Sequence, residues 1–287
     1  MSRRGGVGGE NARPEQPLPG DAEIEDFRAL VLGRYAERGR AFPWRETRDP
    51  WAILVSEVML QQTQTERVVP KYLAWMEAFP VPGALADAPL AEVLALWSGL
   101  GYNRRALALR SAAAEIAAAG GVPDDEEALL ALPGVGRYTA RAVLAFAFGR
   151  PVVLIETNIR AVYLHHFFPR NESVPDSLIE PVIAATMSRG DPRTWYYALM
   201  DYGVELKRTL GNPNIRSAHY AKQSPFADSN RRIRGAILRE LGSRGRAGGD
   251  EIAAALPFSR ERVDGALAQL IAEGFVAESG GTYRLGD

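Results

Sequence analysis

Residues 132–139 read Leu-Pro-Gly-Val-Gly-Arg-Tyr-Thr and separate two segments of helical periodicity. Gly134 and Gly136 allow a tight turn that can approach another backbone closely, because glycine has no Cβ atom. The next predicted helix, residues 137–148, begins directly after this turn, so its free amide hydrogens and the positive end of its dipole can face an anion. A nucleic-acid phosphate fits such a cradle, and so does a purely structural connection between two helices.

The composition is that of an ordinary globular protein. The 287 residues include 34 basic and 35 acidic side chains, with a formal net charge of -1, and 46% of the residues are hydrophobic. These values argue against a disordered, collagen-like or coiled-coil chain. No apolar run reaches the roughly 18 residues of a membrane span, so we expect a soluble protein without a membrane partner. The balanced total charge can still conceal a basic patch.

The chain contains no cysteine and only three histidines. The lack of cysteine excludes disulfides, thiolate nucleophiles, cysteine-ligated zinc and cysteine-held iron–sulfur clusters. His165 and His166 have no companion at metal-ligand spacing, so we interpret them as structural. The sequence therefore predicts neither a metal nor another cofactor.

The chain is predicted to contain a tail and two domains. Residues 1–22 are rich in Gly and Pro and lack the apolar core of a secretory signal, so we expect a disordered tail and a cytoplasmic protein, associated with the nucleoid in a prokaryote. Residues 23–221 show apolar spacings of three and four, broken by Gly and Pro, which predicts an all-α body. Its expected helices include residues 51–65 and 103–119.

The remaining residues, 222–287, predict a small second domain after a basic connector. Its three amphipathic segments are residues 231–241, 250–256 and 259–272. They precede an alternating pattern around Ser279-Gly280-Gly281, which indicates a hairpin. Three helices and a hairpin resemble a winged helix-turn-helix. Its recognition helix mixes charges, so a packing role is as consistent as DNA reading, and Arg231, Arg232 and Arg234 are better candidates for phosphate contacts.

Glu57 stands inside an almost wholly apolar segment. Residues 51–60 read Trp-Ala-Ile-Leu-Val-Ser-Glu-Val-Met-Leu, so every face of this predicted helix is expected to be buried. A buried carboxylate is costly unless it is paired or protonated. Burial raises the pKa of a carboxyl group, so such an acid can donate a proton near neutral pH. The alternative interpretation is a buried ion pair with an arginine.

A second carboxylate follows a short apolar run. Residues 152–155 are Val-Val-Leu-Ile, and they bring Glu156 and Asn158 to the start of the next predicted helix. The structural interpretation is a helix cap, because a carboxylate accepts hydrogen bonds from the free amides there. The functional interpretation is a carboxylate beside a developing positive charge.

Five pieces of the sequence, spread over residues 35–203, together resemble the helix-hairpin-helix DNA glycosylases, and most closely the MutY adenine glycosylases. They are Phe42-Pro-Trp-Arg45, residues 56–64 (Ser-Glu-Val-Met-Leu-Gln-Gln-Thr-Gln), residues 97–102 (Trp-Ser-Gly-Leu-Gly-Tyr), residues 132–139 and Glu156-Thr-Asn158. The resemblance implies an all-α fold of two helical lobes. It also implies a monomeric enzyme whose partner is duplex DNA with a mispaired or damaged base, which is flipped out before its N-glycosidic bond is cleaved.

The resemblance implies a role for each matching residue. The candidate catalytic residues are Glu57, which protonates the departing base, Glu156, Tyr138 and Asn158, which orients the carboxylate. The candidate base-pocket residues are Phe42, Trp44, Arg45 and Tyr197. The candidate DNA-binding residues are Gln62 and Tyr102, which insert into the base stack, and Gly134, Val135 and Gly136, which hold a phosphate. Tyr138 stands where the endonuclease III branch has a Schiff-base lysine, so we expect no strand cleavage.

Four features depart from the family pattern. The family has Asp and usually Gly where this chain has Glu156 and Thr157; an added methylene displaces the carboxylate by roughly 1 Å, which can cost about 100-fold in rate. The family usually has four cysteines that hold an iron–sulfur cluster, and Lys207 and Asn214 stand at the positions of the first two. Tyr197 stands where MutY proteins read adenine with Gln or Glu, and the winged-helix candidate replaces the domain that recognises 8-oxoguanine.

Three functions therefore remain open. The first is excision of adenine opposite guanine or 8-oxoguanine, which Gln61-Gln62-Thr63 favours. The second is excision of thymine or uracil opposite guanine, since related enzymes share the Phe-Pro-Trp-Arg element and a tyrosine in the Gly-x-Gly turn. The third is a lesion-binding protein with weak or no catalysis, which Glu156 makes conceivable.

Overall fold

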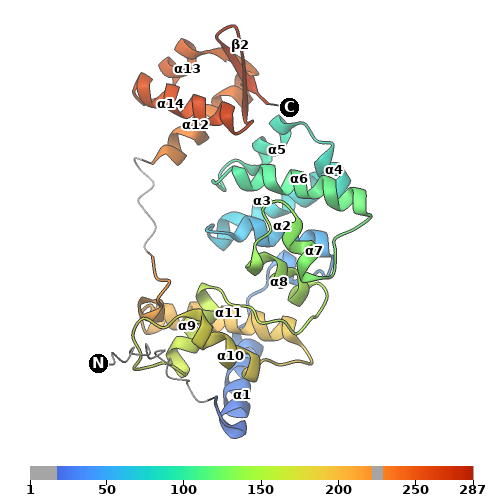
Figure 1. The fold of residues 1–287 in the computed structure, drawn as a ribbon, viewed down its shortest axis with the longest axis vertical. Coiled ribbons are helices and arrows are strands. Elements are labelled where there is room, and N and C mark those ends of the chain that lie inside the picture. Colours follow the sequence, from blue (N-terminus) through green and yellow to red (C-terminus); the bar gives the residue numbers. More distant parts are fainter. Residues whose placement is uncertain (1–17, 222–228, 287) are drawn as a thin grey trace, which may run out of the picture. The chain divides into compact units, whose positions relative to one another are not determined.

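A computed structural model describes residues 18–221 and 229–286, and it is helical except for a small sheet near the C-terminus (Figure 1). The chain forms two compact units. The first comprises Met1–Arg38, Ile155–Ser188 and Trp195–Tyr220, and the second comprises Gly39–Leu154, Arg189–Thr194 and Ala221–Asp287. Most of the predicted tail, and residues 222–228 of the predicted connector, lie outside the described residues. Within the described part, no helix is both long and apolar enough to cross a bilayer.

The first unit packs around Phe27. Its elements are α1 (Asp21–Arg38), α9 (Thr157–His166), α10 (Asp176–Thr186), α11 (Pro192–Thr209) and the short 3-10 helix η2 (Pro213–Arg216). The Phe27 ring makes edge contacts with Tyr163, His166, Phe167 and Trp195 at centroid distances of 5.0–5.8 Å. Arg28 ties α1 to the end of α10 by donating hydrogen bonds to the carbonyl oxygens of Ala185, Thr186 and Met187.

The second unit packs around α2. Its elements before residue 155 are η1 (Pro43–Arg45), α2 (Pro50–Leu60), α3 (Thr65–Ala78), α4 (Pro82–Ala86), α5 (Leu90–Trp97), α6 (Arg104–Ala119), α7 (Glu126–Ala131) and α8 (Arg137–Phe146). Helix α2 contacts α3, α6 and α8, and residues 51–59 are all buried. The Asp49 carboxylate starts α2 by accepting hydrogen bonds from the amides of Trp51 and Ala52.

The expected helix over residues 51–65 is wrong at its C-terminal end. Helix α2 ends at Leu60, Gln62 has φ +55°, and α3 starts at Thr65. The physical cause is Arg105, which donates hydrogen bonds to the carbonyl oxygens of Val58, Met59 and Gln61. Carbonyls in the last turn of a helix have no partner within the helix. The expected helices over residues 103–119 and 137–148 are confirmed, the second with an earlier end at Phe146.

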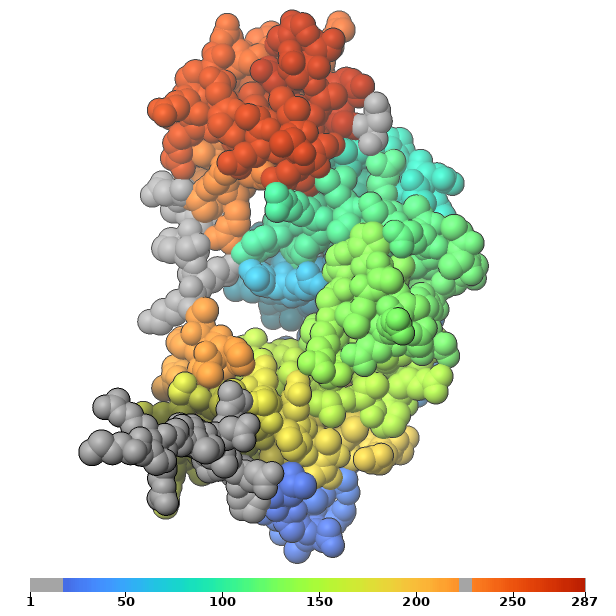
Figure 2. Space-filling model, in the orientation of Figure 1, coloured from blue at the N-terminus to red at the C-terminus, as the bar shows by residue number. Residues whose placement is uncertain are grey.

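The winged-helix prediction for the C-terminus is confirmed. The elements are α12 (Asn230–Arg244), β1 (Arg246–Gly248), α13 (Gly249–Ala255), α14 (Arg260–Ala272), β2 (Val276–Ser279) and β3 (Thr282–Leu285), drawn orange to red in Figure 2. The antiparallel sheet has the order β1-β3-β2. Ser279 pairs with Thr282, so the turn is Gly280-Gly281, both with positive φ. The sequence did not predict β1, since three residues are too short for an alternating pattern.

These C-terminal elements share their unit with residues 39–154. Helix α12 contacts α5, and a Cβ added at Gly286 would lie 3.6 Å from Leu90. The division into domains at residues 23–221 and 222–287 stays a prediction.

His166 has a structural environment, as expected for the histidine pair. Its Nε2 atom lies 2.8 Å from the Tyr202 hydroxyl, and its ring packs on Phe27. Burial lowers the pKa of His166 to about 4, helped by the nearby charges of His165 and Arg34. The neutral imidazole is thus the form that the first unit accommodates.

This pKa shift predicts a loss of stability in acid. Between pH 6.5 and about 4 the unfolded chain binds a proton at residue 166 that the folded chain does not, so the free energy of unfolding falls as pH falls through this window. Allowing for partial exposure, we expect a contribution of about 1 kcal/mol. Denaturant unfolding at several pH values should show a smaller slope for His166→Gln than for wild type. The exposed His219 provides the control variant His219→Gln, whose slope should equal that of wild type.

Candidate active site

Glu57 and Tyr138 meet at the centre of the second unit. Glu57 lies two turns into α2 and is 4% exposed, so its predicted burial is confirmed. The Tyr138 hydroxyl, in the first turn of α8, donates a hydrogen bond to Glu57 Oε2 over 2.9 Å. One oxygen of the buried carboxyl group therefore has a fixed hydroxyl partner, which also fixes the direction of the group.

The turn before α8 sets the position of Tyr138. Gly134 has φ +76°, and a Cβ atom built there would lie 2.6 Å from the Ala108 Cβ of α6. Val135 is buried, whereas Gly134 and Gly136 are exposed. Gly136 precedes α8, has a negative φ, and has no atom within 4 Å of a built Cβ. The fold thus requires glycine at position 134 but not at position 136.

Phe42, Trp44 and Arg45 lie together in and beside η1, which contacts α2. The Phe42 and Trp44 rings are stacked, with centroids 5.1 Å apart and an interplanar angle of 8°. The Arg45 guanidinium lies 5.1 Å from the Phe42 centroid and donates to the Arg40 carbonyl. Trp44 is buried against Tyr72. The three predicted pocket residues therefore form one cluster.

Arg193 braces this cluster and was not identified from the sequence. Its guanidinium is buried and donates to the carbonyl oxygens of Arg45 and Thr47 at 2.8 and 2.6 Å, and to that of Phe146 at the end of α8. A single arginine in a Pro-Arg-Thr stretch carries no signal of such distant partners. Its five donors suit a loop whose carbonyls lack other partners.

Gln62 and Tyr102, the residues expected to insert into DNA, share an unusual backbone conformation. Their φ values are +55° and +50°, and among the non-glycine residues of the described chain only Ser173 is also positive. The left-handed region is costly for residues with a Cβ atom and is over-represented at functional sites. Gln62 is exposed and Tyr102 is half-buried.

Arg105 anchors both of these strained loops. Besides the carbonyl oxygens of Val58, Met59 and Gln61, it donates to Thr63 Oγ1 and to the carbonyl oxygens of Leu100 and Gly101. Burial lowers the pKa of Arg105 to about 10, so it remains charged at neutral pH. The sequence carries a signal for this role, because an arginine in the first turn of a helix opposes the helix dipole and needs a partner elsewhere.

The C-terminal elements reach the same loop. Arg231 of α12 donates a hydrogen bond to the Tyr102 hydroxyl, and its guanidinium lies 5.1 Å from the Tyr102 ring. Glu273 accepts hydrogen bonds from Arg104 and Arg234, and these two arginines hold the pKa of its carboxyl at about 2. Arg231 and Arg234, expected to contact phosphate, are thus engaged within the protein.

Glu156 and Asn158 lie in the first unit, at the start of α9. Glu156 Oε1 accepts hydrogen bonds from the amides of Asn158 and Ile159 at 2.6 and 2.8 Å, and Oε2 accepts from Asn158 Nδ2 at 3.2 Å. The predicted helix cap is therefore confirmed. Burial raises the pKa of the Glu156 carboxyl, while these amides and the charges of Lys207 and Arg160 oppose the rise.

Helix α11 packs tightly on this cap. A Cβ atom built at Gly203 would lie 2.2 Å from the Asn158 carbonyl oxygen, so only glycine fits. Tyr197, the remaining predicted pocket residue, is buried in α11 with 5% exposure. The candidate residues thus form two sets, one in each unit.

The residues at the cluster positions do not fit an iron–sulfur cluster. The sequence offers no thiolate, and the buried Asn214 side chain donates its amide hydrogens to Thr157 and Asn212 oxygens. Within the described residues, no three His, Cys, Asp or Glu side chains are grouped as metal ligands.

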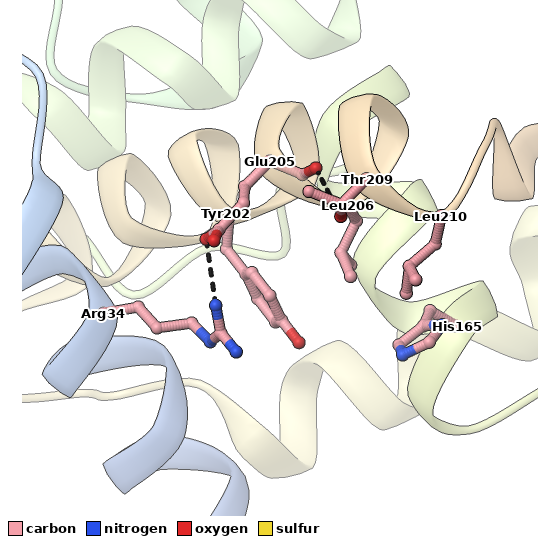
Figure 3. A pocket seen from close by; sticks show the side chains of 7 residues that line it. All are labelled: Arg34, His165, Tyr202, Glu205, Leu206, Thr209 and Leu210. Atoms are coloured by element: carbon pink, nitrogen blue, oxygen red, sulfur yellow. Dashed lines mark hydrogen bonds and ion pairs between the residues drawn. The ribbon is translucent and has the colours of Figure 1, made fainter.

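A pocket of about 270 Å³ lies between α1, α9 and α11 (Figure 3). Arg34 and Glu205 on its wall are paired at 3.0 Å, and the Arg34 guanidinium lies 4.8 Å from the Tyr202 centroid. The charged side chains of Arg34 and Glu205 in the wall are thus paired with each other.

Comparison with known proteins identifies the family. Residues 55–181 match the model of the HhH-GPD superfamily base excision DNA repair proteins. The adenine DNA glycosylase of Mycolicibacterium smegmatis is 34% identical over 272 residues, 87% of this chain and 92% of that protein. The chain belongs to the HhH-GPD superfamily.

Two further relatives of this HhH-GPD protein differ in the base that their names give. The adenine DNA glycosylase of Mycobacterium tuberculosis is 41% identical over 198 residues, which are 67% of this chain and 64% of that relative, so the chain spans just under two thirds of it. The thymine/uracil-DNA glycosylase of Pyrobaculum aerophilum is 36% identical over 146 residues, 50% of this chain and 64% of that protein.

Solved structures confirm the helix-hairpin-helix glycosylase fold. A thermostable thymine-DNA glycosylase has a TM-score of 0.57 and 26% identity, covering 64% of this chain and 87% of its own. A trapped covalent endonuclease III–DNA intermediate has a TM-score of 0.56 and 21% identity, covering 72% and 91%.

The contact between Gly203 and Asn158 generates a stability prediction. Gly203→Ala forces a methyl group against the α9 backbone, so we expect the free energy of unfolding to fall by about 3 kcal/mol. Gly33→Ala is the matched control: Gly33 lies in α1, and a Cβ there meets no atom within 4 Å. That change should stabilise the protein by about 0.5–1 kcal/mol. Thermal and denaturant unfolding measure both, and equal behaviour of the two variants would contradict the packing argument.

Proposed function

We propose that this protein is a monofunctional DNA glycosylase that removes adenine mispaired with guanine or 8-oxoguanine. The observation that carries the proposal is the buried Glu57 carboxyl group with Tyr138 on one oxygen. A buried acid of this kind is costly to the fold, which argues for a chemical use. The substrate is duplex DNA, the protein acts as a monomer, and it works in the cytoplasm, on the nucleoid of a prokaryote.

Glu57 serves as the proton donor. It transfers its proton to a ring nitrogen of the flipped adenine, the bond between sugar C1′ and adenine N9 breaks, and its electron pair leaves with the neutral base. A water molecule then attacks C1′ and gives its proton to the Glu57 carboxylate, which restores the acid. The Tyr138 hydroxyl donates to Oε2 and so holds the direction of the Glu57 carboxyl group.

Glu156 stabilises the positive charge that develops on the sugar. Two backbone amides and the Asn158 side chain hold its carboxylate. A fixed charge needs no reorganisation when the sugar becomes cationic. Glutamate has a longer side chain than the aspartate of the family. If this protein departs from the proposed function, we therefore expect a low rate of base release.

Tyr138 excludes the lyase chemistry of the endonuclease III branch. A phenol cannot form the Schiff base through which a lysine cuts the strand. The abasic site is therefore the product.

The DNA contacts come from the strained loops and from the turn before α8. Gln62 and Tyr102 insert into the base stack, and their left-handed backbone conformations are typical of functional sites. Gly134, Val135 and Gly136 hold a phosphate at the start of α8 through the amides of Gly134 and Gly136, because the Val135 amide donates to the Leu132 carbonyl oxygen. The open space at Gly136 supports this assignment.

Excision of thymine or uracil opposite guanine is the second candidate function. The likeness to the Pyrobaculum aerophilum protein and to the thymine-DNA glycosylase structure favours it, as does Tyr197 in place of an adenine-reading amide. A third candidate, lesion binding with little catalysis, rests on Glu156 alone.

Base release distinguishes the three. Single-turnover assays with alkali cleavage use duplexes with adenine opposite 8-oxoguanine, adenine opposite guanine, and thymine or uracil opposite guanine. We expect adenine release, reduced by at least about 100-fold in Glu57→Gln, with duplex affinity unchanged. Full activity of Glu57→Gln would remove Glu57 from the mechanism. Release of thymine or uracil would establish the second candidate, and tight binding without any release the third.

The two glycines of the turn give a second prediction. Gly136→Ala has room for its methyl group, so it should fold normally and weaken duplex binding about tenfold through lost contact with phosphate. Gly134→Ala places a methyl group 2.6 Å from Ala108 at positive φ and should lower the melting temperature instead. Duplex titration and thermal unfolding of both variants provide the comparison. Normal DNA affinity of Gly136→Ala would contradict the phosphate assignment.

A further inference from the structure

The segment after α11 turns back over α9. Its short helix η2 contacts α9, and Asn214 within it is 4% exposed. Asn214 Nδ2 donates a hydrogen bond to the Thr157 carbonyl oxygen over 3.0 Å. Thr157 stands between Glu156 and Asn158, so this hydrogen bond holds the backbone next to the residue that carries the carboxylate.

The same segment is anchored at the other end of α9. Arg216 donates to the carbonyl oxygens of Leu164 and Pro169 at 2.8 and 3.2 Å. Backbone hydrogen bonds join Val174 to the carbonyl of Arg216 and Ala218 to the carbonyl of Val174. The segment is therefore held at both ends of α9, by Asn214 at one end and by Arg216 at the other.

Helix α11 supports the cap from a second direction. Gly203 contacts the Asn158 backbone, and Lys207 follows four residues later, on the same face of α11. The positive charge of Lys207 acts on the Glu156 carboxyl group. Two elements therefore converge on the first turn of α9.

We propose that Asn214 and Lys207 are positioning residues for Glu156, Asn214 by holding the Thr157 backbone and Lys207 by supplying a positive charge. The inference rests on the proposed role of Glu156 in base release. Both residues stand where the related glycosylases carry cluster cysteines, so in this chain a hydrogen bond and a charge tie that segment to the carboxylate.

The other charged groups around α9 are committed to partners. Arg160 of α9 pairs with Asp176 of α10 through two hydrogen bonds of 2.7 Å. Arg34 of α1 pairs with Glu205 of α11, and Arg216 of η2 is bonded to carbonyls. Of the two cationic side chains that lower the pKa of Glu156, Lys207 acts more strongly than Arg160, so removal of the Lys207 charge should affect the ionisation of Glu156 more.

Asn214 is tested by the variant Asn214→Ala, with Ile215→Ala as the control because Ile215 is 68% exposed in the same helix. We expect amide exchange at Asn158 and Ile159 to quicken about fivefold, the loss that one hydrogen bond accounts for, and base release to slow with duplex affinity unchanged. Asn214→Gln, which keeps a donor, should restore part of the loss. Unchanged exchange in Asn214→Ala would overturn the proposal even if the rate fell.

Lys207 is tested by the pH at which Glu156 ionises. This pH is read from the difference in unfolding free energy between each protein and its Glu156→Gln version across a range of pH. Because the Lys207 charge lowers the pKa of Glu156, Lys207→Met should move the transition to higher pH. Lys207→Arg should not move it, nor should Arg208→Met, which removes an exposed neighbouring charge. An unmoved transition in Lys207→Met would overturn its role.

Both measurements separate this inference from the proposed function. If the wild-type protein releases no base from any duplex, the glycosylase proposal fails, and exchange and stability still decide whether Asn214 and Lys207 act on Glu156. If base release is normal in both variants, Glu156 does not need them and the inference fails alone.

Discussion

The second unit depends on a carboxyl group that its central helix buries. Every residue from 51 to 59 of α2 is buried, so Glu57 must find its polar partner inside the protein. Tyr138 supplies one from α8, and α8 reaches that position because Gly134 lets the preceding turn touch Ala108. The turn at Gly134 therefore places the hydroxyl that orients the acid. A single close approach of the turn to α6 thus sets the start of α8 and the position of Tyr138.

Buried arginines stabilise the irregular loops of the second unit. Arg105 donates to six acceptors, two in the last turn of α2 and four in the loops that carry Gln62 and Tyr102. Arg193 does the same for the loop after η1. A guanidinium has donors in several directions and keeps its charge when buried. The loops can then keep a strained backbone without losing their hydrogen bonds.

The parts predicted from the sequence were those with local physical causes. Apolar spacing around Glu57 indicated its burial, a carboxylate before an apolar helix indicated the Glu156 cap, and Gly280-Gly281 indicated the hairpin. The missed features depend on partners far along the chain. Arg105 bonds Met59 in the last turn of α2 across a separation of 46 residues, and Asn214 bonds Thr157 across a separation of 57 residues. Periodicity carries no information about such bonds, because either partner alone looks like an ordinary polar residue.

The structure shows how glutamate is accommodated at position 156, where the family has aspartate. An extra methylene could have displaced the carboxylate, yet Glu156 folds back on its own helix and bonds two amides of the first turn, as a shorter cap residue does. A glutamate side chain has one more rotatable bond than aspartate, so it leaves this folded-back conformation more easily. The backbone that carries it must therefore be held more firmly. Asn214 on Thr157 and Gly203 on Asn158 do this from two sides. Glu156 and the contacts of Asn214 and Gly203 are therefore parts of one arrangement, in which the contacts hold the backbone that carries the longer side chain.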